Sequence, residues 1–361
     1  MASLSELGNS LYRGDVSYNI VGRRKAWYLI SAILVVLSLA TLGVRGLNLG
    51  IEFKGGAEFS VPLTVANDES VSQARETVLA AGETPSTVTI IGGDTIRIQT
   101  PALSTEASNA LSAALADSFA VDEANIKVQL VGPSWGDEVT QNALRALLVF
   151  LVLVAIFLSI YFEWHMAVAA LAALAHDVLI TVGIYALSGF EVTPASVIGF
   201  LTILGYSLYD TVVVFDKVKE NTHGIHGGSR TTYSEAANLA LNQTLVRSIN
   251  TSVVALLPVL SILIVGVTLL GAGTLNDLAL ALFVGMLVGT YSSIFVATPF
   301  LCQMKERTAE NIALAKRVHA KRKNGDSAEV KQVVAVGAPI VASAGPRQQR
   351  VKKTRSRRTG K

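Results

Sequence analysis

The sequence predicts a polytopic α-helical membrane protein with six transmembrane helices and a small α+β, ferredoxin-like extracytoplasmic domain between helices 1 and 2. The first reason is composition: 51% of the 361 residues are hydrophobic and only 16% are charged, whereas soluble proteins are about 25% charged. The second is that the apolar residues gather into stretches close to the roughly 20 residues that cross a bilayer core. The third is that strand-like alternation is confined to one segment. Together these observations exclude a simple soluble enzyme and a disordered chain.

Residues 1–25 are expected to form a cytoplasmic N-terminus, and residues 26–44 the first transmembrane helix. No charged residue lies between Lys25 and Arg45. This apolar run is longer than the roughly 7–15 residues of a signal-peptide core, and no small-x-small cleavage site follows it. The first span is therefore predicted to be an uncleaved anchor.

Residues 45–140 are predicted to form the extracytoplasmic α+β domain. Gly92-Gly93-Asp94 separates two strand-like runs and is typical of a hairpin turn. Strands are expected at residues 57–63, 87–91, 95–99 and 125–131, and helices at 70–81 and 104–119. The resulting order, β-α-β-β-α-β, is that of the ferredoxin-like split unit. Because that order is common, it says little about function.

Residues 141–304 are predicted to contain transmembrane helices 2–6. Their expected spans are about 141–162, 166–188, 192–215, 248–270 and 274–300. The cytoplasmic loop 216–247 separates the fourth span from the fifth. Within it, Thr232 and Glu235 have the spacing of a capping box that starts a helix through Ala240. Such a helix is compatible with a bilayer-surface helix and equally with a plain connector.

Residues 305–361 are predicted to form a basic, disordered cytoplasmic tail. The apolar run at 333–345 is too short to cross a membrane. Residues 350–358 form a dense basic run. Anionic lipid attracts such runs by about 1 kcal/mol per basic residue, and RNA also binds them. We expect contact with anionic lipid and no sequence-specific recognition.

The sign of the charges orients the chain in the membrane. Residues 1–25 carry four bases and two acids, residues 45–140 carry five bases and thirteen acids, and residues 303–361 carry sixteen bases and four acids. Positively charged segments stay in the cytoplasm. Both termini are therefore predicted to be cytoplasmic, which agrees with an even number of spans.

Ionisable side chains lie inside three of the predicted spans: Asp177 beside His176 in the third, Asp210 in the fourth, and Arg247 at the start of the fifth. Such groups are costly in a membrane and usually functional. A carboxylate near a guanidinium can switch between a paired and a protonated form, as a proton relay requires. From the residues alone, an Asp210–Arg247 relay and a static strut have about equal support. His176 and Asp177 are weaker relay candidates, because adjacent residues point to different faces of a helix.

Polar residues at helical spacing accompany these groups and predict polar stripes that face one another or water. The predicted stripe residues are Thr202, Tyr206, Ser207, Asn250 and Thr251. Small residues spaced by four indicate close helix packing. The predicted packing residues are Gly199, Gly285 and Gly289.

The sequence shows no nucleophile–base arrangement, metal-ligand spacing or phosphate-binding loop. We therefore expect no catalytic site, no metal and no cofactor, and any work the protein does requires an ion gradient or a partner. Cys302 is the single cysteine, so no intramolecular disulfide can form.

Several segments between about residue 12 and residue 305 together resemble the SecF proteins of the SecD/SecF family. They are residues 18–25, 51–56, 131–136, 176–177, 205–216, 242–245 with Arg247, and 289–293. SecF proteins are auxiliary subunits of the bacterial Sec protein-export machinery, within the resistance-nodulation-division superfamily. The chain departs from the usual family pattern at Glu52, Trp135 and Tyr209. Tyr209 matters most, because it adjoins Asp210.

The resemblance implies a protein of the bacterial cytoplasmic (inner) membrane. It implies that the chain pairs with SecD, a six-span partner subunit, beside the SecYEG channel, and acts indirectly with the ATPase SecA. The pair would use proton flow to promote late-stage translocation and release of preprotein substrates. Asp210 matches the family's proton-linked aspartate and Arg247 its partner arginine, which favours the relay over the strut.

Two other functions compete with this interpretation. One is half of a proton-driven small-molecule or lipid exporter of the same superfamily. Six spans and one small external domain argue against it, because such exporters usually carry twelve spans and larger external domains. The other is a passive assembly protein, for which the charges within the membrane would be dispensable.

Overall fold

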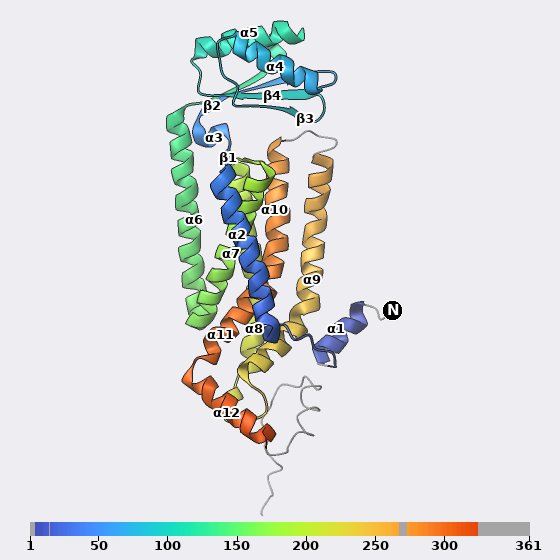
Figure 1. The fold of residues 1–361 in the computed structure, drawn as a ribbon, viewed down its shortest axis with the longest axis vertical. Coiled ribbons are helices and arrows are strands. Elements are labelled where there is room, and N and C mark those ends of the chain that lie inside the picture. Colours follow the sequence, from blue (N-terminus) through green and yellow to red (C-terminus); the bar gives the residue numbers. More distant parts are fainter. Residues whose placement is uncertain (1–3, 14, 267–272, 324–361) are drawn as a thin grey trace, which may run out of the picture.

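The computed structural model describes residues 4–13, 15–266 and 273–323. Within these residues, six helices are long and apolar enough to cross a membrane, which confirms the predicted fold class (Figure 1). The helices of the bundle are α2 (Arg24–Arg45), α6 (Pro133–Tyr161), α7 (Trp164–Ser188), α8 (Pro194–Thr222), α9 (Tyr233–Val265) and α10 (Gly273–Ser292). The sixth span continues from α10 through a π-helical turn, η5 (Ser293–Ala297), into α11 (Thr298–Glu306).

The α+β domain lies between α2 and α6. Its elements are β2 (Gly56–Pro62), α4 (Asp68–Ala80), β3 (Thr87–Ile91), β4 (Thr95–Thr100), α5 (Thr105–Phe119), the short helix η2 (Glu123–Asn125) and β5 (Lys127–Val131). The sheet order is β3-β4-β2-β5 with antiparallel neighbours throughout. Because β4 pairs antiparallel with both β2 and β3, the latter two are parallel strands joined across α4. This is the predicted ferredoxin-like split unit.

Alternating residues give the sheet an apolar face and a polar face. Phe59, Val61, Ile96 and Ile98 are fully buried beneath α4 and α5, on the side of the sheet away from the helical bundle (Figure 1). The opposite face, one residue out of step, points toward the bundle. The turn between β3 and β4 has positive φ at Gly92 and Gly93, as a tight hairpin requires.

The domain joins the bundle through three short elements, β1 (Asn48–Leu49), α3 (Ile51–Lys54) and β6 (Glu191–Val192). β1 and β6 pair as parallel strands at the end of the bundle that carries the domain. Two glycines bring α3 against the start of α6. A Cβ on Gly55, whose φ is +75°, would lie 2.9 Å from Pro133 Cα, and one on Gly136 would lie 2.7 Å from the Phe53 carbonyl oxygen. The backbone approach at this junction therefore depends on glycine.

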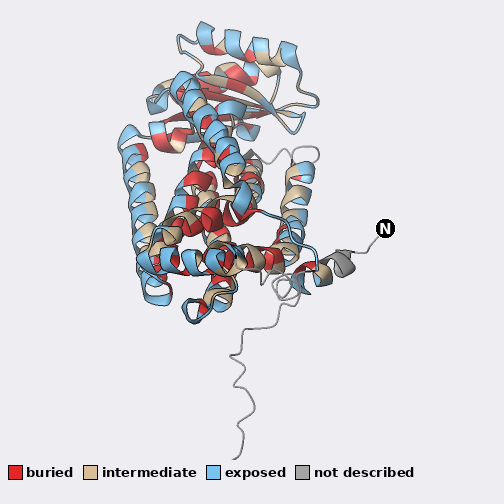
Figure 2. Ribbon diagram, turned by 60° about the horizontal axis from the view of Figure 1, so that its bottom comes forward, coloured by how far each residue is buried: buried red, intermediate tan, exposed pale blue. Residues whose placement is uncertain are grey.

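The bundle has a buried centre and an exposed periphery. In their most apolar stretches, 56%, 39% and 50% of the residues of the third, fourth and sixth spans are buried, against 11%, 11% and 17% in the first, second and fifth. Figure 2 shows the exposed outer faces of the peripheral helices around the buried core. The third, fourth and sixth spans are therefore where polar residues can be kept from lipid.

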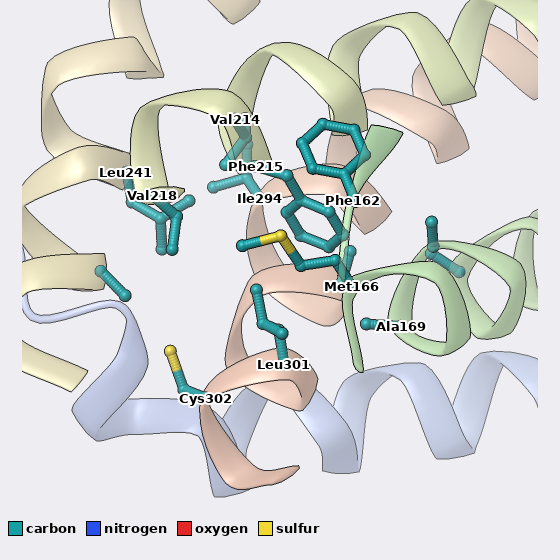
Figure 3. Close-up of a cluster of buried hydrophobic side chains, with 14 of the residues drawn as sticks. Phe162, Met166, Ala169, Val214, Phe215, Val218, Leu241, Ile294, Leu301 and Cys302 are labelled. Atoms are coloured by element: carbon teal, nitrogen blue, oxygen red, sulfur yellow. The ribbon is translucent and has the colours of Figure 1, made fainter. Parts of the chain in front are cut away.

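A hydrophobic cluster fastens the spans at the end opposite the domain. Phe162 and Phe215 meet edge to face, with Met166, Leu301 and Cys302 buried around them (Figure 3). These side chains come from α7, α8, α11 and the end of α6 (Figure 3). Close packing of large apolar side chains holds these helices at fixed rotations at this end.

The predicted loop at residues 216–247 is mostly helical. α8 extends to Thr222, a short turn η3 (Ile225–Gly227) follows, and α9 begins at Tyr233. The capping box of Thr232 and Glu235 forms, but the helix it starts does not end near Ala240. Alanines along this segment are buried against the neighbouring helices, and neither glycine nor proline follows before Pro258, so the helix continues into the fifth span. It is neither a separate surface helix nor a connector.

The prediction of disorder from residue 305 is wrong for residues 305–323. α11 runs to Glu306, and α12 (Ala309–Lys323) follows. Leu314 and Val318 of α12 are fully buried in one cluster with Ile225 and Ala236, an apolar surface that exists only after folding. Residues 324–361, with their basic run, lie outside the described residues.

At the other end of the chain, α1 (Leu4–Arg13) packs against α9, and the short helix η1 (Val21–Arg23) precedes α2.

Candidate functional site

Two aspartates are buried within the spans. Asp177 on α7 is 2% exposed and Asp210 on α8 is 6% exposed. An ionised carboxylate in this setting costs several kcal/mol unless it is paired, hydrogen-bonded or protonated. The identity of the groups around each carboxylate therefore decides what it can do.

Serine hydroxyls surround Asp210. Ser248 Oγ on α9 donates to Asp210 Oδ1 at 2.7 Å, and Ser293 Oγ donates to Oδ2. Both serines are buried. Within the described residues, no ion pair reaches Asp210. A hydroxyl can donate to a carboxylate and can also accept from a carboxylic acid, so this pocket satisfies either protonation state.

Asp177 has a similar environment. Its Oδ2 accepts from Ser207 Oγ on α8 at 2.6 Å and from Ser292 Oγ on α10 at 2.8 Å. Its Oδ1 lies 3.1 Å from His176 Nδ1. The neighbouring histidine therefore does reach the same site, although adjacent residues diverge on a helix.

Adjacent serines on the sixth span link the two aspartates. Ser292 ends α10 and bonds to Asp177, and Ser293 begins the π-helical turn and bonds to Asp210. Consecutive side chains on a helix point about 100° apart, so one helix can serve carboxylates on two neighbours. π-helical turns are often found at functional sites. Together, Asp177, Ser292, Ser293 and Asp210 form one hydroxyl–carboxylate network across three helices.

Small residues bring α8 and α10 close enough for these bonds. A Cβ on Gly289 would lie 2.9 Å from Ser207 Cβ, and one on Gly199 would lie 2.9 Å from Ala281 Cβ. A Cβ on Gly285 would collide with the side chain of Ile203. All three glycines predicted as packing residues thus lie in the contact between these two helices, which brings Ser207 within reach of the network.

His176 extends the network toward the first span. Its side chain is 8% exposed, and Nε2 has no hydrogen-bond partner among the described residues. The ring stacks on Tyr291 at 6.2 Å between centroids, and the Tyr291 hydroxyl lies 3.1 Å from Ser31 Oγ on α2. Polar contacts therefore continue from α7 across α10 to α2.

The predicted Asp210–Arg247 pair does not form within the described residues. Arg247 is exposed, and α9 instead presents the next residue, Ser248, to Asp210. Ser252, one turn further along α9, bonds to Thr290 on α10 at 2.6 Å. The inward face of α9 is thus offset by one residue from the predicted one.

The residues of the predicted polar stripe also differ in burial. Ser207 is buried in the network, whereas Thr202 and Asn250 are exposed and Tyr206 and Thr251 are half-buried. The exposed members, with Arg247, lie on sides of α8 and α9 that the described chain leaves uncovered. The described residues contain no group of three His, Cys, Asp or Glu side chains that could hold a metal ion.

Sequence reasoning missed Ser248, Ser292 and Ser293 as functional candidates. Serine is tolerated in transmembrane helices for many reasons, so single serines carry little signal. A usable signal was the adjacent pair at 292–293 in an otherwise apolar span. It could have been weighed against the two buried aspartates.

Comparison with protein-family models matches the chain to two of them. "Protein export membrane protein SecD/SecF, C-terminal" matches residues 111–307, which includes every span after the first and the whole network. "SecD/SecF GG Motif" matches residues 40–65, where Gly55 and Gly56 form the tight approach between α3, the sheet and α6.

Comparison with known proteins gives relatives over most of the chain. SecF of Streptomyces coelicolor is 50% identical over 325 residues, which cover 90% of this chain and 87% of that one. SecF of Mycobacterium tuberculosis is 42% identical and covers 92% and 77%. The crystal structure of SecDF from Thermus thermophilus matches with a TM-score of 0.70 and 32% identity, over 81% of this chain and 39% of that longer chain. The chain therefore belongs to the SecD/SecF family, among the SecF subunits of the Sec protein translocase.

Proposed function

We propose that this chain, paired with SecD in the cytoplasmic membrane, uses the proton gradient to promote late-stage translocation and release of preproteins. The observation that carries the proposal is the environment of Asp210. It is buried among apolar helices and bonded to two serine hydroxyls, with no cation beside it among the described residues. Neutralisation by a proton is the inexpensive way to keep such a carboxylate in place.

This environment supports a relay more than a strut. A strut that joins the fourth and fifth spans would need Arg247 beside Asp210 throughout, and here Arg247 is exposed. Hydroxyl groups that serve both the charged and the neutral carboxyl allow protons to be exchanged without rebuilding the site. Asp177, which accepts from Ser207 and from Ser292, offers a second carboxyl next to this site.

The exposed polar residues of α8 and α9 support the proposal that a partner subunit covers this face. Thr202, Arg247 and Asn250 lie in spans but remain uncovered by the described chain. Polar groups at membrane depth are costly against lipid and usually face protein or water. In Thermus thermophilus the relative is a longer chain named SecDF, and the present chain covers 41% of its length. We infer that SecD covers this face and that Arg247 acts from the interface between the two subunits.

The charge distribution supports the orientation of the pair. The α+β domain lies in the acidic segment 45–140, and the opposite end of the bundle carries the basic segments. Positive segments stay inside, which places the domain outside, where preproteins emerge from the SecYEG channel. SecA then acts from the other side of the membrane and only indirectly on this subunit.

The test is Asp210→Asn in translocase reconstituted with SecD and the channel. We expect loss of the component of preprotein translocation that depends on the proton gradient, with unchanged recovery of the complex. Asp216→Asn is the matched control, because Asp216 lies on the same helix and is exposed. Full gradient-dependent translocation by Asp210→Asn would exclude the relay and leave a passive assembly role.

A further inference from the structure

A second group of buried carboxylates lies where the α+β domain meets the bundle. Glu191 of β6 and Asp277 of α10 are each 5% exposed. Glu52 of α3 is half-buried, and its Oε2 is shielded from solvent. Neither Glu52 Oε2 nor Asp277 Oδ2 has a hydrogen-bond partner among the described residues. Unsatisfied carboxylate oxygens in this position are costly and call for an explanation.

The carboxylates lie close together. A Cβ built on Gly50 would lie 2.5 Å from Glu52 Oε2 and 3.0 Å from Glu191 Oε1, so these two oxygens flank one point. The charged groups that act on Asp277 are Glu191, Arg97 and Glu52. Asp277 therefore points into the same cluster rather than toward lipid.

The domain supplies the counter-charge from the polar face of its sheet. Arg97 Nη2 of β4 lies 3.0 Å from Glu191 Oε2. Gln99 Nε2, two residues along the strand, donates to Glu191 Oε1 at 2.7 Å and to Glu58 Oε2 at 2.9 Å. The polar contact between sheet and Glu191 is thus one hydrogen bond and one ion pair.

Negative charge exceeds positive charge at this junction. Among the described residues, Glu52 is affected by the charges of Glu191, Glu58 and Arg97, and Asp277 by those of Glu191, Glu52 and Arg97, so Arg97 is the one cation among these groups. The Tyr185 hydroxyl of α7 is engaged by the backbone carbonyl of Asp277. The first turns of α6, which packs against α3, carry Asp137 and Glu138, and both are exposed.

Such a cluster cannot be fully ionised at low cost, because buried like charges repel one another. Burial raises the pKa of Glu52, and the neighbouring Glu191 and Glu58 raise it further. The oxygens of Glu52 and Glu191 flank the same point beside Gly50, so a proton on either carboxyl removes the repulsion between two charges there. A bound proton would also satisfy an oxygen that otherwise lacks a donor.

We propose that Glu52, Glu191 and Asp277 form a proton-binding site at the outer junction, and that release of its proton loosens the α+β domain from the bundle. With the proton bound, the three carboxylates and Arg97 together carry a net charge of −1 instead of −2, and the domain stays seated. Without it, repulsion among the carboxylates opposes the Arg97–Glu191 contact. The site thereby links the protonation state to the position of the domain.

Buried polar residues on one face of α7 lie between this site and the aspartate network. Tyr185, bonded to the Asp277 carbonyl, and Thr181 are fully buried on α7. Thr181 donates to the backbone carbonyl of Asp177 at 2.7 Å. The three residues follow one another at intervals of four, on one face of the helix. Use of the junction proton in export rests on the proposed function, whereas the movement of the domain does not.

The direction of the pH effect follows from Glu52. Its pKa is higher in the seated state than when the carboxyl is free in water, so the seated state binds more protons. Seating is then favoured at low pH and weakens as pH rises from the ordinary pKa of a glutamate toward the raised one. Loosening on acidification is the opposite result and would overturn the proposal.

The experiment measures the distance between two spin labels on the full-length chain in lipid nanodiscs. Asn109→Cys on α5 and Leu187→Cys at the domain end of α7 are exposed sites, and Cys302→Ser removes the native thiol. As pH rises from about 4 to about 9, a range that spans the ordinary and raised pKa values of glutamate carboxyl groups, we expect a second, longer distance to grow. A distance distribution that stays the same over this range would overturn the proposal.

Variants that imitate the protonated site and a variant that removes its cation should shift the distance between the labels in opposite directions. Glu52→Gln and Asp277→Asn should keep the short distance at high pH, because neutral side chains imitate the bound proton. Arg97→Gln should move the transition to lower pH, because loss of the Arg97–Glu191 contact weakens the seated state at every pH, and Arg97→Lys should restore it. Glu138→Gln, at an exposed carboxylate, is the matched control. A wild-type response in both Glu52→Gln and Asp277→Asn would overturn the proposal.

A final arm separates this site from the relay. In an Asp210→Asn background we expect the pH response of the domain to remain, even though gradient-dependent export is lost. Persistence of the response together with full export by Asp210→Asn would remove the proposed relay and leave the junction site standing. Loss of the response in that background would show that the domain follows Asp210, and would overturn an independent junction site.

Discussion

The two groups of buried carboxylates are built from different partners. Asp177 and Asp210 accept hydrogen bonds from neutral serine hydroxyls supplied by neighbouring helices. At the junction, Glu191 forms an ion pair with the guanidinium of Arg97, with further carboxylates close by. Neutral donors suit both protonation states, so a proton can come and go with little change in geometry. An ion pair surrounded by further carboxylates does not suit both protonation states. Binding or loss of a proton there changes whether the seated position of the domain is stable.

The two groups of carboxylates suit two different roles in the proposed coupling of protons to transport. The inner network lies among close-packed helices, where Gly289 and Gly285 leave little room for movement between α8 and α10. The junction lies between a domain with its own core and the bundle, so the parts on either side can separate. We infer that the inner network passes protons and that the junction converts protonation into movement.

The largest expected effect comes from the carboxyls of the inner network. Asp177→Asn and Asp210→Asn should each abolish gradient-dependent translocation if the two residues act as one unit. The double variant should then be no worse than either single variant, because effects within one unit are not additive. Gradient-dependent translocation in the reconstituted complex measures this. Normal transport by Asp177→Asn would confine the relay to Asp210.

The arrangement of the elements was largely predictable from the sequence. Strict alternation around Phe59 and Ile98, with the Gly92-Gly93 turn, predicted the sheet correctly, because a period of two leaves few choices of buried face. Charge-free runs close to 20 residues long predicted six spans, because a helix that crosses a bilayer needs about that length. α12 was missed because Leu314 and Val318 have an apolar surface to cover only once Ile225 and Ala236 have been brought together.

The aspartates of the site and two partners of Asp177, His176 and Ser207, were predictable, but the serines of α9 and of the sixth span were not. Asp177 and Asp210 were conspicuous as charges inside apolar runs. The choice between Arg247 and Ser248 depends on the rotation of α9, where one residue corresponds to about 100°. That rotation is set by packing against α8 and α10 and not by local sequence. The π-helical turn likewise changes the register of the sixth span at Ser293, which a regular helical period does not anticipate.

The next effect in size tests whether hydroxyl donors matter. Ser248→Ala and Ser293→Ala should each lower gradient-dependent translocation about tenfold or more, since a hydrogen bond to a charged group is worth about 1.5–3 kcal/mol and about 1.4 kcal/mol is tenfold in rate. Ser261→Ala is the control on α9, because Ser261 is exposed and bonds to its own helix. Equal activity of all three variants would mean that Asp210 works without these donors.

A smaller effect is expected from packing around the network. Gly289→Ala places a methyl group 2.9 Å from Ser207 Cβ, and overpacking of this kind costs about 1–3 kcal/mol. Gly205→Ala is the matched control, since a Cβ there meets nothing within 4 Å. Thermal unfolding of the purified chain should show a lower midpoint for Gly289→Ala alone. Unchanged midpoints for both would show that α8 and α10 have room to separate, against the rigid inner network.

The smallest effect is expected at a second ion pair, which serves as a reference for Arg97. Arg322 of α12 binds Glu235 through two contacts of 2.7 and 2.8 Å, but the two side chains are 30% and 42% exposed, against 16% and 5% for Arg97 and Glu191. Exposed pairs contribute about 0–1 kcal/mol and weaken with salt. Arg322→Gln should therefore lower thermal stability by under about 1 kcal/mol and leave the pH response of the domain unchanged. If it moved that response as far as Arg97→Gln does, the effect of Arg97 would reflect overall charge, and burial would not be what gives the junction its sensitivity to protons.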